Sequence, residues 1–335
     1  MSPTDPPARS VDEFDVIARL LRPLTNGAPE ALNLLDDAAV VATGAGEDLV
    51  ISADMIVEGV HFLSTDPLDL VAQKLLRVNL SDLAAKGARP YAYVLTIAWP
   101  SRFGHAEREA FVLGLRHAQD AFGLILLGGD TTSTPGPLTA SVTILGRTPQ
   151  GGMVLRSGAR VGDLVLVSGC IGDGWLGLQA ALGKDEGLSA QARAAVIDRY
   201  RLPQPRMVMS ELLRSRAHAA ADVSDGLLAD ANHIATASGL AMDLDLDLMP
   251  LSPAGRDFVA RSTDPIAARV ALATGGDDYE IVLTAAAADL DLMVLEASRL
   301  KVPLTVIGKV VEGQGVRVLF GGAQIRVSNL GYQHS

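Results

Sequence analysis

The residues of this chain best able to do chemistry are aspartates in short motifs, set among small or apolar residues over about 240 positions. Six motifs share this character: Asp36-Asp37, Ser52-Ala53-Asp54, Ser81-Asp82, Gly128-Gly129-Asp130, Asp222-Val223-Ser224-Asp225 and Gly275-Gly276-Asp277-Asp278. One aspartate beside Gly or Ser is often a turn residue or a helix N-cap, but six similar motifs favour a shared role. Buried carboxylates need cations or hydrogen bonds to offset their desolvation. Because Mg²⁺ prefers hard oxygen ligands, the motifs predict a site for several magnesium ions.

Residues next to these motifs are suited to binding phosphate. Glycines 128 and 129 let the backbone approach a nucleotide closely, since glycine has no Cβ. The fork of donors on Arg156 could clamp a phosphate, although such an arginine is about as often a surface ion pair. Mg²⁺ is usually held by one or two carboxylates together with substrate phosphates. We therefore predict a site in which cations bridge two anions.

The elements that must position these residues alternate between helix and strand patterns. Helices are predicted at residues 11–24, 68–86, 107–122, 174–182, 189–199, 205–214, 226–238 and 288–300. Strands are predicted at residues 40–42, 48–53, 91–98, 124–127, 138–145, 164–168, 219–222 and 281–283, with several short ones between 304 and 327. This places Asp54 at the end of a strand, Asp82 on a helix, and Gly128 to Thr132 in a turn.

Length and composition indicate a two-domain protein. A chain of 335 residues exceeds the size at which one core usually stops growing. Pro149, Gly151 and Gly152 cluster at a plausible boundary. We predict a disordered tail at residues 1–10, an N-terminal domain at 11–150 and a C-terminal domain at 151–335.

The charge balance excludes some partners. The formal charge is −11, from 39 acidic and 28 basic residues, so neither a nucleic-acid nor an anionic-membrane surface is expected. The chain has one cysteine, Cys170, and no stretch of 18 apolar residues, which predicts a reducing compartment and no membrane span. With no signal-peptide pattern at the N-terminus, we expect a cytoplasmic protein.

Several motifs of other enzyme classes are weak or missing. Residues 172–177 satisfy G-x-G-x-x-G, but no second strand with an acidic end follows about 20 residues later. Gly183-Lys184 lacks the spacing of a phosphate-binding P-loop. There is no H-E-x-x-H zinc motif and no G-x-S-x-G nucleophile elbow.

In their order along the chain, the motifs resemble the thiamine-monophosphate kinase family, over roughly residues 12–333. The matching segments are Asp36-Asp37-Ala38-Ala39, residues 52–62, residues 78–88, Gly128-Gly129-Asp130-Thr131-Thr132, Ser224-Asp225-Gly226-Leu227 and residues 275–280. Single motifs also resemble the wider superfamily of aminoimidazole ribonucleotide synthetase, selenophosphate synthetase and the hydrogenase maturation factor. The His61-Phe62 pair and the phrase at residues 79–83 favour the kinase.

The resemblance implies a fold, a reaction and a set of site residues. The fold is α/β (α+β), a two-domain synthetase-like fold. Its N-terminal α/β domain binds ATP and magnesium and dimerises through β-strands, and its C-terminal α+β domain closes the active site. The implied reaction converts ATP and thiamine phosphate to ADP and thiamine diphosphate in a homodimer. The implied ligands of Mg²⁺ are Asp37, Ser52, Asp54, Asp82, Asp130, Asp222 and Asp225. The implied ATP contacts are Gly129, Asp130, Arg156 and Ser224. The implied thiamine phosphate contacts are His61, Asp277 and a residue between 329 and 332, with Asn329 and Tyr332 as candidates.

Four positions depart from the family pattern. Leu35 stands where glycine is common and stiffens the loop. Ala53 stands where a threonine often helps to hold metal, so that a backbone carbonyl of Ala53 or a water would take its place. Asp277 replaces a frequent glutamate. Asn329 stands near a position that is often aromatic, which leaves Tyr332 as the candidate for stacking on the substrate ring.

The acceptor of this reaction is already an anion near neutral pH, so no general base is assigned. Catalysis by positioning and by neutralising two polyanions is therefore expected, as direct in-line transfer. Two alternatives stay open. One is another ATP-dependent synthetase of the superfamily, with the aminoimidazole ribonucleotide synthetase type as the stronger rival, since this chain lacks the terminal cysteines of the other two. The second is a nucleotide-binding protein without turnover.

Overall fold

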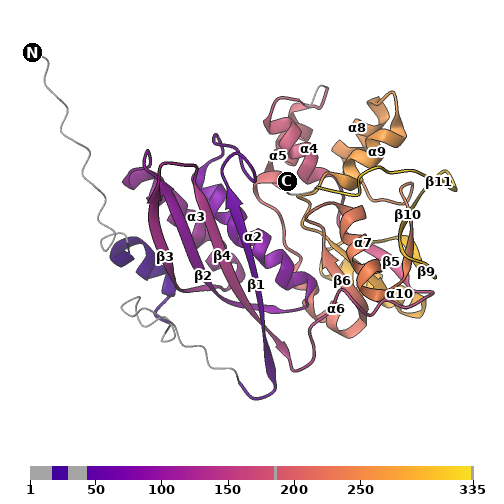
Figure 1. Ribbon diagram of the computed structural model, residues 1–335, viewed down its shortest axis with the longest axis horizontal. Helices are drawn as coiled ribbons and strands as arrows, with labels where there is room; N and C mark the ends of the chain where they lie inside the picture. The colour runs from indigo at the N-terminus through magenta and orange to yellow at the C-terminus, as the bar shows by residue number, and fades with distance from the viewer. Residues whose placement is uncertain (1–16, 29–43, 185–186, 333–335) are drawn as a thin grey trace, which may run out of the picture. The chain divides into compact units, whose positions relative to one another are not determined.

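The computed structural model describes residues 17–28, 44–184 and 187–332 (Figure 1). The predicted tail at 1–10, the predicted strand at 40–42, Leu35 and the predicted ligand Asp37 lie outside these ranges. Contacts divide the chain into two units, and each one draws on several chain segments. The first unit comprises Met1–Ala42, Ala53–Leu76 and Tyr91–Ile144, and the second comprises Thr43–Ser52, Arg77–Pro90 and Leu145–Ser335. The domain boundary near residue 150 stays a prediction.

The first sheet has four strands in the order β1-β4-β2-β3. Its strands are β1 (Glu47–Val57), β2 (Arg89–Pro100), β3 (Ile125–Thr134) and β4 (Thr139–Pro149). The helices α2 (Leu68–Ala85) and α3 (His105–Phe122) lie on one face of it (Figure 1). Both helices confirm the predictions made from apolar spacing. The predicted helix at 11–24 is, where described, a π-helical turn at Ile17–Leu21 followed by a 3₁₀ turn at Arg22–Thr25.

Two sequence predictions in this sheet are wrong. Strand β1 continues to Val57, so Asp54 lies inside the strand and not at its end. Strand β3 continues to Thr134, so the segment from Gly128 to Thr132 is strand and not a turn. The reason lies in the pairing of β2 with β3, which shifts register between Tyr93 and Val94. There a Cβ on Gly129 would collide with the Leu95 carbonyl, so this glycine serves strand packing.

The two faces of the first sheet differ in burial. On β2, Tyr93, Leu95, Ile97 and Trp99 are buried against the helix side. The indole Nε1 of Trp99 donates to Thr131 Oγ1 at 3.0 Å, so Thr131 points to that side as well. Neighbouring residues of a strand point to opposite faces. Asp130, paired with the exposed Thr96, therefore points away from the helices.

The second sheet has seven strands in the order β11-β10-β7-β9-β5-β8-β6. They are β5 (Leu164–Ser168), β6 (Ala217–Asp222), β7 (Ala241–Asp245), β8 (Ile281–Ala285), β9 (Leu304–Val311), β10 (Gly315–Phe320) and β11 (Ala323–Ile325). All neighbours are antiparallel except β7 and β10. One face buries a large apolar cluster that includes Val165, Val167 and Ile234, and the other buries a smaller one around Leu166 and Leu283.

Seven α-helices accompany this sheet in the described residues. They are α4 (Asp173–Ala181), α5 (Ala190–Arg201), α6 (Ser210–Arg216), α7 (Leu227–Ser238), α8 (Pro253–Arg261), α9 (Pro265–Thr274) and α10 (Leu290–Arg299). The predicted helix at 205–214 begins as a 3₁₀ turn at Met207–Met209 and becomes α-helical only at Ser210. No helix in the described part of the chain combines the length and apolar character needed to cross a bilayer.

Candidate functional site

The turn that follows β6 brings several predicted site residues together. Three backbone hydrogen bonds of 2.8 Å join this turn to the loop at residues 275–280. They run from Val223 N to Glu280 O, from Tyr279 N to Val223 O, and from Asp277 N to Ser224 O. Ser224, a predicted ATP contact, therefore lies beside Asp277, a predicted contact of thiamine phosphate. Asp222, at the end of β6, is 5 % exposed. The two loops form one acidic turn pair.

The loop at residues 275–280 holds unusual backbone conformations. Asp277 (φ 63°) and Tyr279 (φ 52°) are both left-handed, and the Tyr279 hydroxyl donates to Asp277 Oδ1 at 3.1 Å. A Cβ on Gly276 would lie 2.6 Å from the Ser224 carbonyl oxygen, so glycine is required there. Left-handed conformations of non-glycine residues cost free energy and gather at functional sites. This strain supports a functional assignment for Asp277.

The end of the described chain packs on the same turn. Tyr332 N donates to the Asp225 carbonyl at 2.8 Å, and a Cβ on Gly331 would come within 2.5 Å of that oxygen. Asn329 Oδ1 accepts a long hydrogen bond of 3.4 Å from Gly331 N. Tyr332 is 52 % exposed. Tyr332 thus lies close to Asp225 and has a ring suited to stacking, while Asn329 is joined to the same segment through Gly331.

Two residues that sequence reasoning missed lie at the start of α7. Ligand atoms of Asp225, Asp230 and His233 are all within 4.8 Å of one another. Asp230 Oδ2 accepts from the backbone N–H groups of Ser224 and Asp225, at 3.0 and 3.1 Å. Burial, and then the charge of Asp225, raise the pKa of the Asp230 carboxyl to about 7. The i, i+3 spacing of Asp230 and His233 on one helix was the available signal.

A second group of predicted residues meets where α2 ends. The Ser52 hydroxyl donates to Asp82 Oδ2 at 2.5 Å, although the two residues are 30 positions apart. Lys86 Nζ donates to the Ala220 carbonyl at 2.9 Å, two residues before Asp222. Burial, and then the charge of Arg156, lower the pKa of Lys86 to about 8, while Asp222 and Asp82 act in the opposite direction. Serine and carboxylate oxygens are the donors that suit Mg²⁺, so these residues fit the predicted ion.

In the first unit, His61 is held by a tight loop after β1. The Val57 backbone N–H donates to His61 Nδ1 at 3.0 Å, and the buried Lys74 ammonium donates to the His61 carbonyl at 3.0 Å. Because Nδ1 accepts, the neutral ring carries its proton on Nε2. The Glu58 carboxylate accepts hydrogen bonds from the Arg102 guanidinium and from the Leu138 backbone N–H, and these contacts stabilise the same loop. His61 is therefore oriented to donate a hydrogen bond from Nε2.

The sheet does not bring Asp54 and Asp130 together within one chain. Asp54 alternates with the exposed Ala53 and Met55 on β1, so it shares the helix side with Ser52. Asp130 and Gly129 lie on β3, at the other edge of the sheet, with β4 and β2 between. Asp130 also points to the opposite face. Three strand spacings amount to about 14 Å, which is too long for both carboxylates to ligate one ion.

The remaining two acidic residues of the loop at 275–280 build structure. Asp278 is fully buried and accepts from Gly172 N at 2.8 Å and Gly174 N at 3.0 Å, which caps α4. Glu280 is also fully buried and binds the guanidinium groups of Arg199 and Arg206. The hydrogen bonds and ion pairs of Asp278 and Glu280 therefore give the second half of this loop a structural role, while the role of Asp277 stays a prediction.

Asp278 predicts a dependence of stability on pH. Burial raises the pKa of its carboxyl from 3.8 to about 8, against the lowering effect of its two backbone hydrogen bonds. A raised folded-state pKa contributes stability that is complete below the unfolded value and is lost as the pH rises towards 8. We expect the free energy of unfolding to fall by roughly 3 kcal/mol from this group between pH 5 and pH 8.

Urea denaturation at both pH values measures this loss. In Asp278→Asn the side chain no longer titrates, so the variant should be less stable at pH 5 and should lose less stability than the wild type on going to pH 8. Equal losses in the two proteins would contradict the assignment.

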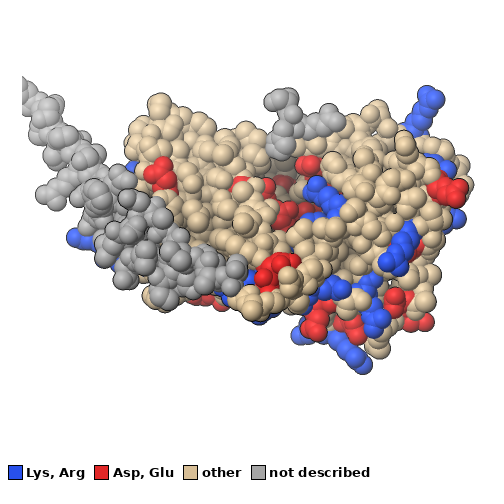
Figure 2. Space-filling view, turned by 60° about the horizontal axis from the view of Figure 1, so that its bottom comes forward, with Lys and Arg blue, Asp and Glu red and all other residues tan. Residues whose placement is uncertain are grey.

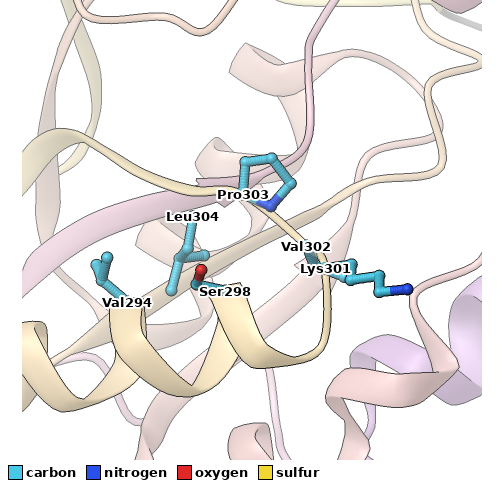
Figure 3. A pocket seen from close by; sticks show the side chains of 6 residues that line it. All are labelled: Val294, Ser298, Lys301, Val302, Pro303 and Leu304. Carbon is cyan, nitrogen blue, oxygen red and sulfur yellow. The ribbon is translucent and has the colours of Figure 1, made fainter.

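The pocket lined by Val294, Ser298, Lys301, Val302, Pro303 and Leu304 lies away from these residues in the sequence and contains none of them (Figure 3). Its volume is about 430 Å³. It is lined by the end of α10 and the start of β9, with one charged group. On the face shown in Figure 2, basic and acidic side chains are interspersed among the described residues, without a continuous basic area.

Comparison with known proteins defines the class. The family model for the N-terminal domain of AIR synthase related proteins matches residues 35–148. The family model for the C-terminal domain of the same proteins matches residues 160–321. The chain thus has the two-domain α/β synthetase-like fold, as predicted. It is also 50 % identical over 329 residues to the thiamine-monophosphate kinase of Caulobacter vibrioides, covering 98 % of this chain and 92 % of that one.

Solved structures agree with this relationship. The crystal structure of thiamine-monophosphate kinase from Stenotrophomonas maltophilia is 40 % identical with a TM-score of 0.81, covering 92 % of this chain and 96 % of that chain. The structure described as AaThiL complexed with AMPPCP and TMP is 29 % identical with a TM-score of 0.74, covering 96 % and 97 %. The chain belongs to the thiamine-monophosphate kinase family, which is a family of phosphotransferases.

Proposed function

We propose that this protein transfers the γ-phosphoryl group of ATP to thiamine phosphate and so forms thiamine diphosphate. The observation that carries the proposal is the related structure that holds AMPPCP, an ATP analogue, together with TMP, which we interpret as thiamine monophosphate, and covers 96 % of this chain. The 50 % identical relative bears the name of the same kinase. Because ATP is the co-substrate, we infer a cytoplasmic location.

We further propose that the transfer is direct, in line, and assisted by several Mg²⁺ ions. The ions would be held by Ser52, Asp54, Asp82, Asp222 and Asp225, by Asp130, by the Ala53 carbonyl and by Asp37. When bound, they would neutralise the facing phosphate groups and lower their mutual repulsion. The support from this chain is the set of oxygen donors around Asp82 and Asp222 and the strained turn pair beside Asp225.

The other side chains have positioning roles. Arg156 would bind a nucleotide phosphate through its planar fork, and Ser224 and the backbone at Gly129 would contact ATP. Asp277, held left-handed against Ser224, would orient thiamine phosphate. Since the acceptor oxygen is already ionised, none of these residues needs to remove a proton. Catalysis then consists of alignment and charge stabilisation.

We infer a homodimer that pairs through β-strands of the first sheet. On the edge strand β1, Ile51 is 60 % and Met55 52 % exposed, and exposed apolar edge strands are templates for pairing. Asp130 points to the open face, away from Asp54, so a second copy is the natural source of the Asp130 that completes each site. A mass equal to one chain in light scattering would contradict this inference.

His61→Ala is expected to raise the Michaelis constant for thiamine phosphate about tenfold and to leave that for ATP unchanged. The loss corresponds to one hydrogen bond to a charged phosphate, worth about 1.5 kcal/mol. Steady-state kinetics with each substrate varied in turn measures the split. His105→Ala, at the exposed start of α3, is the matched control. A His61 variant with an unchanged constant for thiamine phosphate would show that the ring only packs.

The decisive test of the proposed reaction is to incubate the purified protein with ATP, Mg²⁺ and thiamine phosphate and to measure thiamine diphosphate and ADP by chromatography. Formation of both supports the proposal. Turnover of ATP only with an aminoimidazole ribonucleotide precursor would select the synthetase alternative. Calorimetric binding of ATP with no ADP formed from either acceptor would select a nucleotide-binding protein.

A further inference from the structure

Lys86 is a cation at the predicted metal site, and the sequence motifs assign no role to this lysine. Its backbone is fixed on both sides, because its N–H donates to the Asp82 carbonyl at 3.0 Å and its carbonyl accepts from Val154 N at 3.1 Å. Its ammonium reaches the Ala220 carbonyl on β6 at 2.9 Å. Ala220 N in turn donates to the Leu155 carbonyl at 3.0 Å. Backbone and side-chain hydrogen bonds of Lys86 and Ala220 thus join the end of α2, β6 and the segment before Arg156, each of which carries a predicted site residue.

The charges around Lys86 define an electrostatic balance. Asp82 and Asp222 both favour the charged ammonium, whereas burial and Arg156 disfavour it. Asp82 lies one helical turn before Lys86, and Asp222 lies two residues beyond the carbonyl that the ammonium contacts. A cation in this position lowers the mutual repulsion of the two carboxylates. It also repels any further cation that approaches them.

We propose that Lys86 is the built-in counter-cation of Asp82 and Asp222 in the free protein, and that it keeps Mg²⁺ binding weak there until the phosphates of the nucleotide arrive. The proposal rests on the magnesium site of the proposed function. Polyphosphate adds negative charge that offsets both Lys86 and Arg156, so the carboxylates then hold Mg²⁺ without opposition. Lys86 in this role is a positioning residue that couples metal binding to nucleotide binding.

A purely structural role for Lys86 makes a different prediction. In that case Lys86 would only anchor the end of α2 to β6 through the Ala220 carbonyl, and its loss would lower stability without tightening any cation. The neighbouring Arg214 offers a matched control, because its guanidinium donates to the Gly87 carbonyl and ties the same chain segment to α6. Burial and the charge of Arg156 lower the pKa of Lys86, whereas Asp222 and Asp82 both raise it.

The experiment is a calorimetric titration of MgCl₂ into the full-length protein, with and without saturating AMPPCP. For Lys86→Met we expect the dissociation constant of Mg²⁺ without nucleotide to fall about tenfold. The gain in Mg²⁺ affinity that AMPPCP produces should shrink by a similar factor. Lys86→Arg, which keeps the charge, and Arg214→Met should both bind Mg²⁺ as the wild type does. Thermal unfolding of each variant confirms that it is folded.

Lys86→Gln is the second variant, because it keeps a donor for the Ala220 carbonyl and removes only the charge. The same tenfold tightening in Lys86→Gln supports the proposal even if Lys86→Met does not fold. Unchanged or weaker Mg²⁺ binding in a folded neutral variant would overturn it, and so would tightening in Lys86→Arg. If the wild type binds no Mg²⁺ even with AMPPCP, the metal site of the proposed function fails and this inference fails with it.

Discussion

Asp82→Asn is expected to lower kcat at least about a hundredfold at saturating Mg²⁺, while the melting temperature changes little. The substitution keeps the shape of the side chain and an oxygen for the Ser52 hydroxyl, but it removes the negative charge beside Lys86 and Asp222. In phosphoryl transfer nearly all catalysis comes from positioning and charge stabilisation, and removal of one such group typically costs 10² to 10³ in rate.

The measurement is the steady-state rate of thiamine diphosphate formation over a range of Mg²⁺ concentrations, together with calorimetric melting. Asp69→Asn is the matched control, because Asp69 lies in the first turn of the same helix and is not a predicted ligand. It should keep the wild-type kcat. A folded Asp82→Asn protein with wild-type turnover at saturating Mg²⁺ would rule out a metal-holding role for this carboxylate.

The sequence predicted well those elements in which the periodic spacing of apolar residues continues without interruption over a long segment. In α2, apolar residues recur at helical spacing from Leu70 to Leu83, and the helix is observed within one residue of the expected bounds. The elements that were missed are β7, α8 and α9. The sequence Met242-Asp243-Leu244-Asp245 alternates as a strand should, but it is short. Helices α8 and α9 each begin with proline after a Ser or Asp cap, in segments only about ten residues long.

The roles of the predicted site residues stay predictions, but the structure shows which of these residues lie together. Ser224 and Asp277 are 53 positions apart and are joined by a backbone hydrogen bond between the turn after β6 and the loop at residues 275–280. The orientation of Asp130 depends on the register shift between β2 and β3, which residue types do not reveal. Motif reading also could not separate Asp277 from Asp278, since only the fold shows that the second caps α4.

The surroundings of Lys86 also could not be predicted from the sequence. A lysine at the end of an amphipathic helix is an ordinary solvent-facing residue by sequence. Only the structure shows that its ammonium contacts the Ala220 carbonyl beside a predicted ligand. The acidic motifs can be recognised because they recur along the chain, whereas Lys86, the cation beside two of them, belongs to no recurring pattern. Charges that act in opposition to a motif are therefore easy to miss in sequence reading.

Glu280→Gln is expected to lower the free energy of unfolding by about 3–5 kcal/mol. The carboxylate binds Arg206 Nε at 2.6 Å and Arg199 at 3.0 Å, and Ser168 Oγ donates to it at 2.7 Å. Ser168 Oγ also accepts from Ile281 N at 2.8 Å, so this network ties β5 to β8. A neutral amide would leave two arginines, whose side chains are each 20 % exposed, without their shared counter-charge.

Urea denaturation of the variant and the wild type, followed by far-UV circular dichroism, measures the loss. Asp257→Asn is the control, because the Asp257–Arg261 pair is exposed on both sides and such pairs contribute no more than about 1 kcal/mol. If Glu280→Gln costs no more than this control, the buried pairs do not stabilise the sheet. The Glu280 loss should also persist at 1 M salt, since buried charges are screened far less than surface ones.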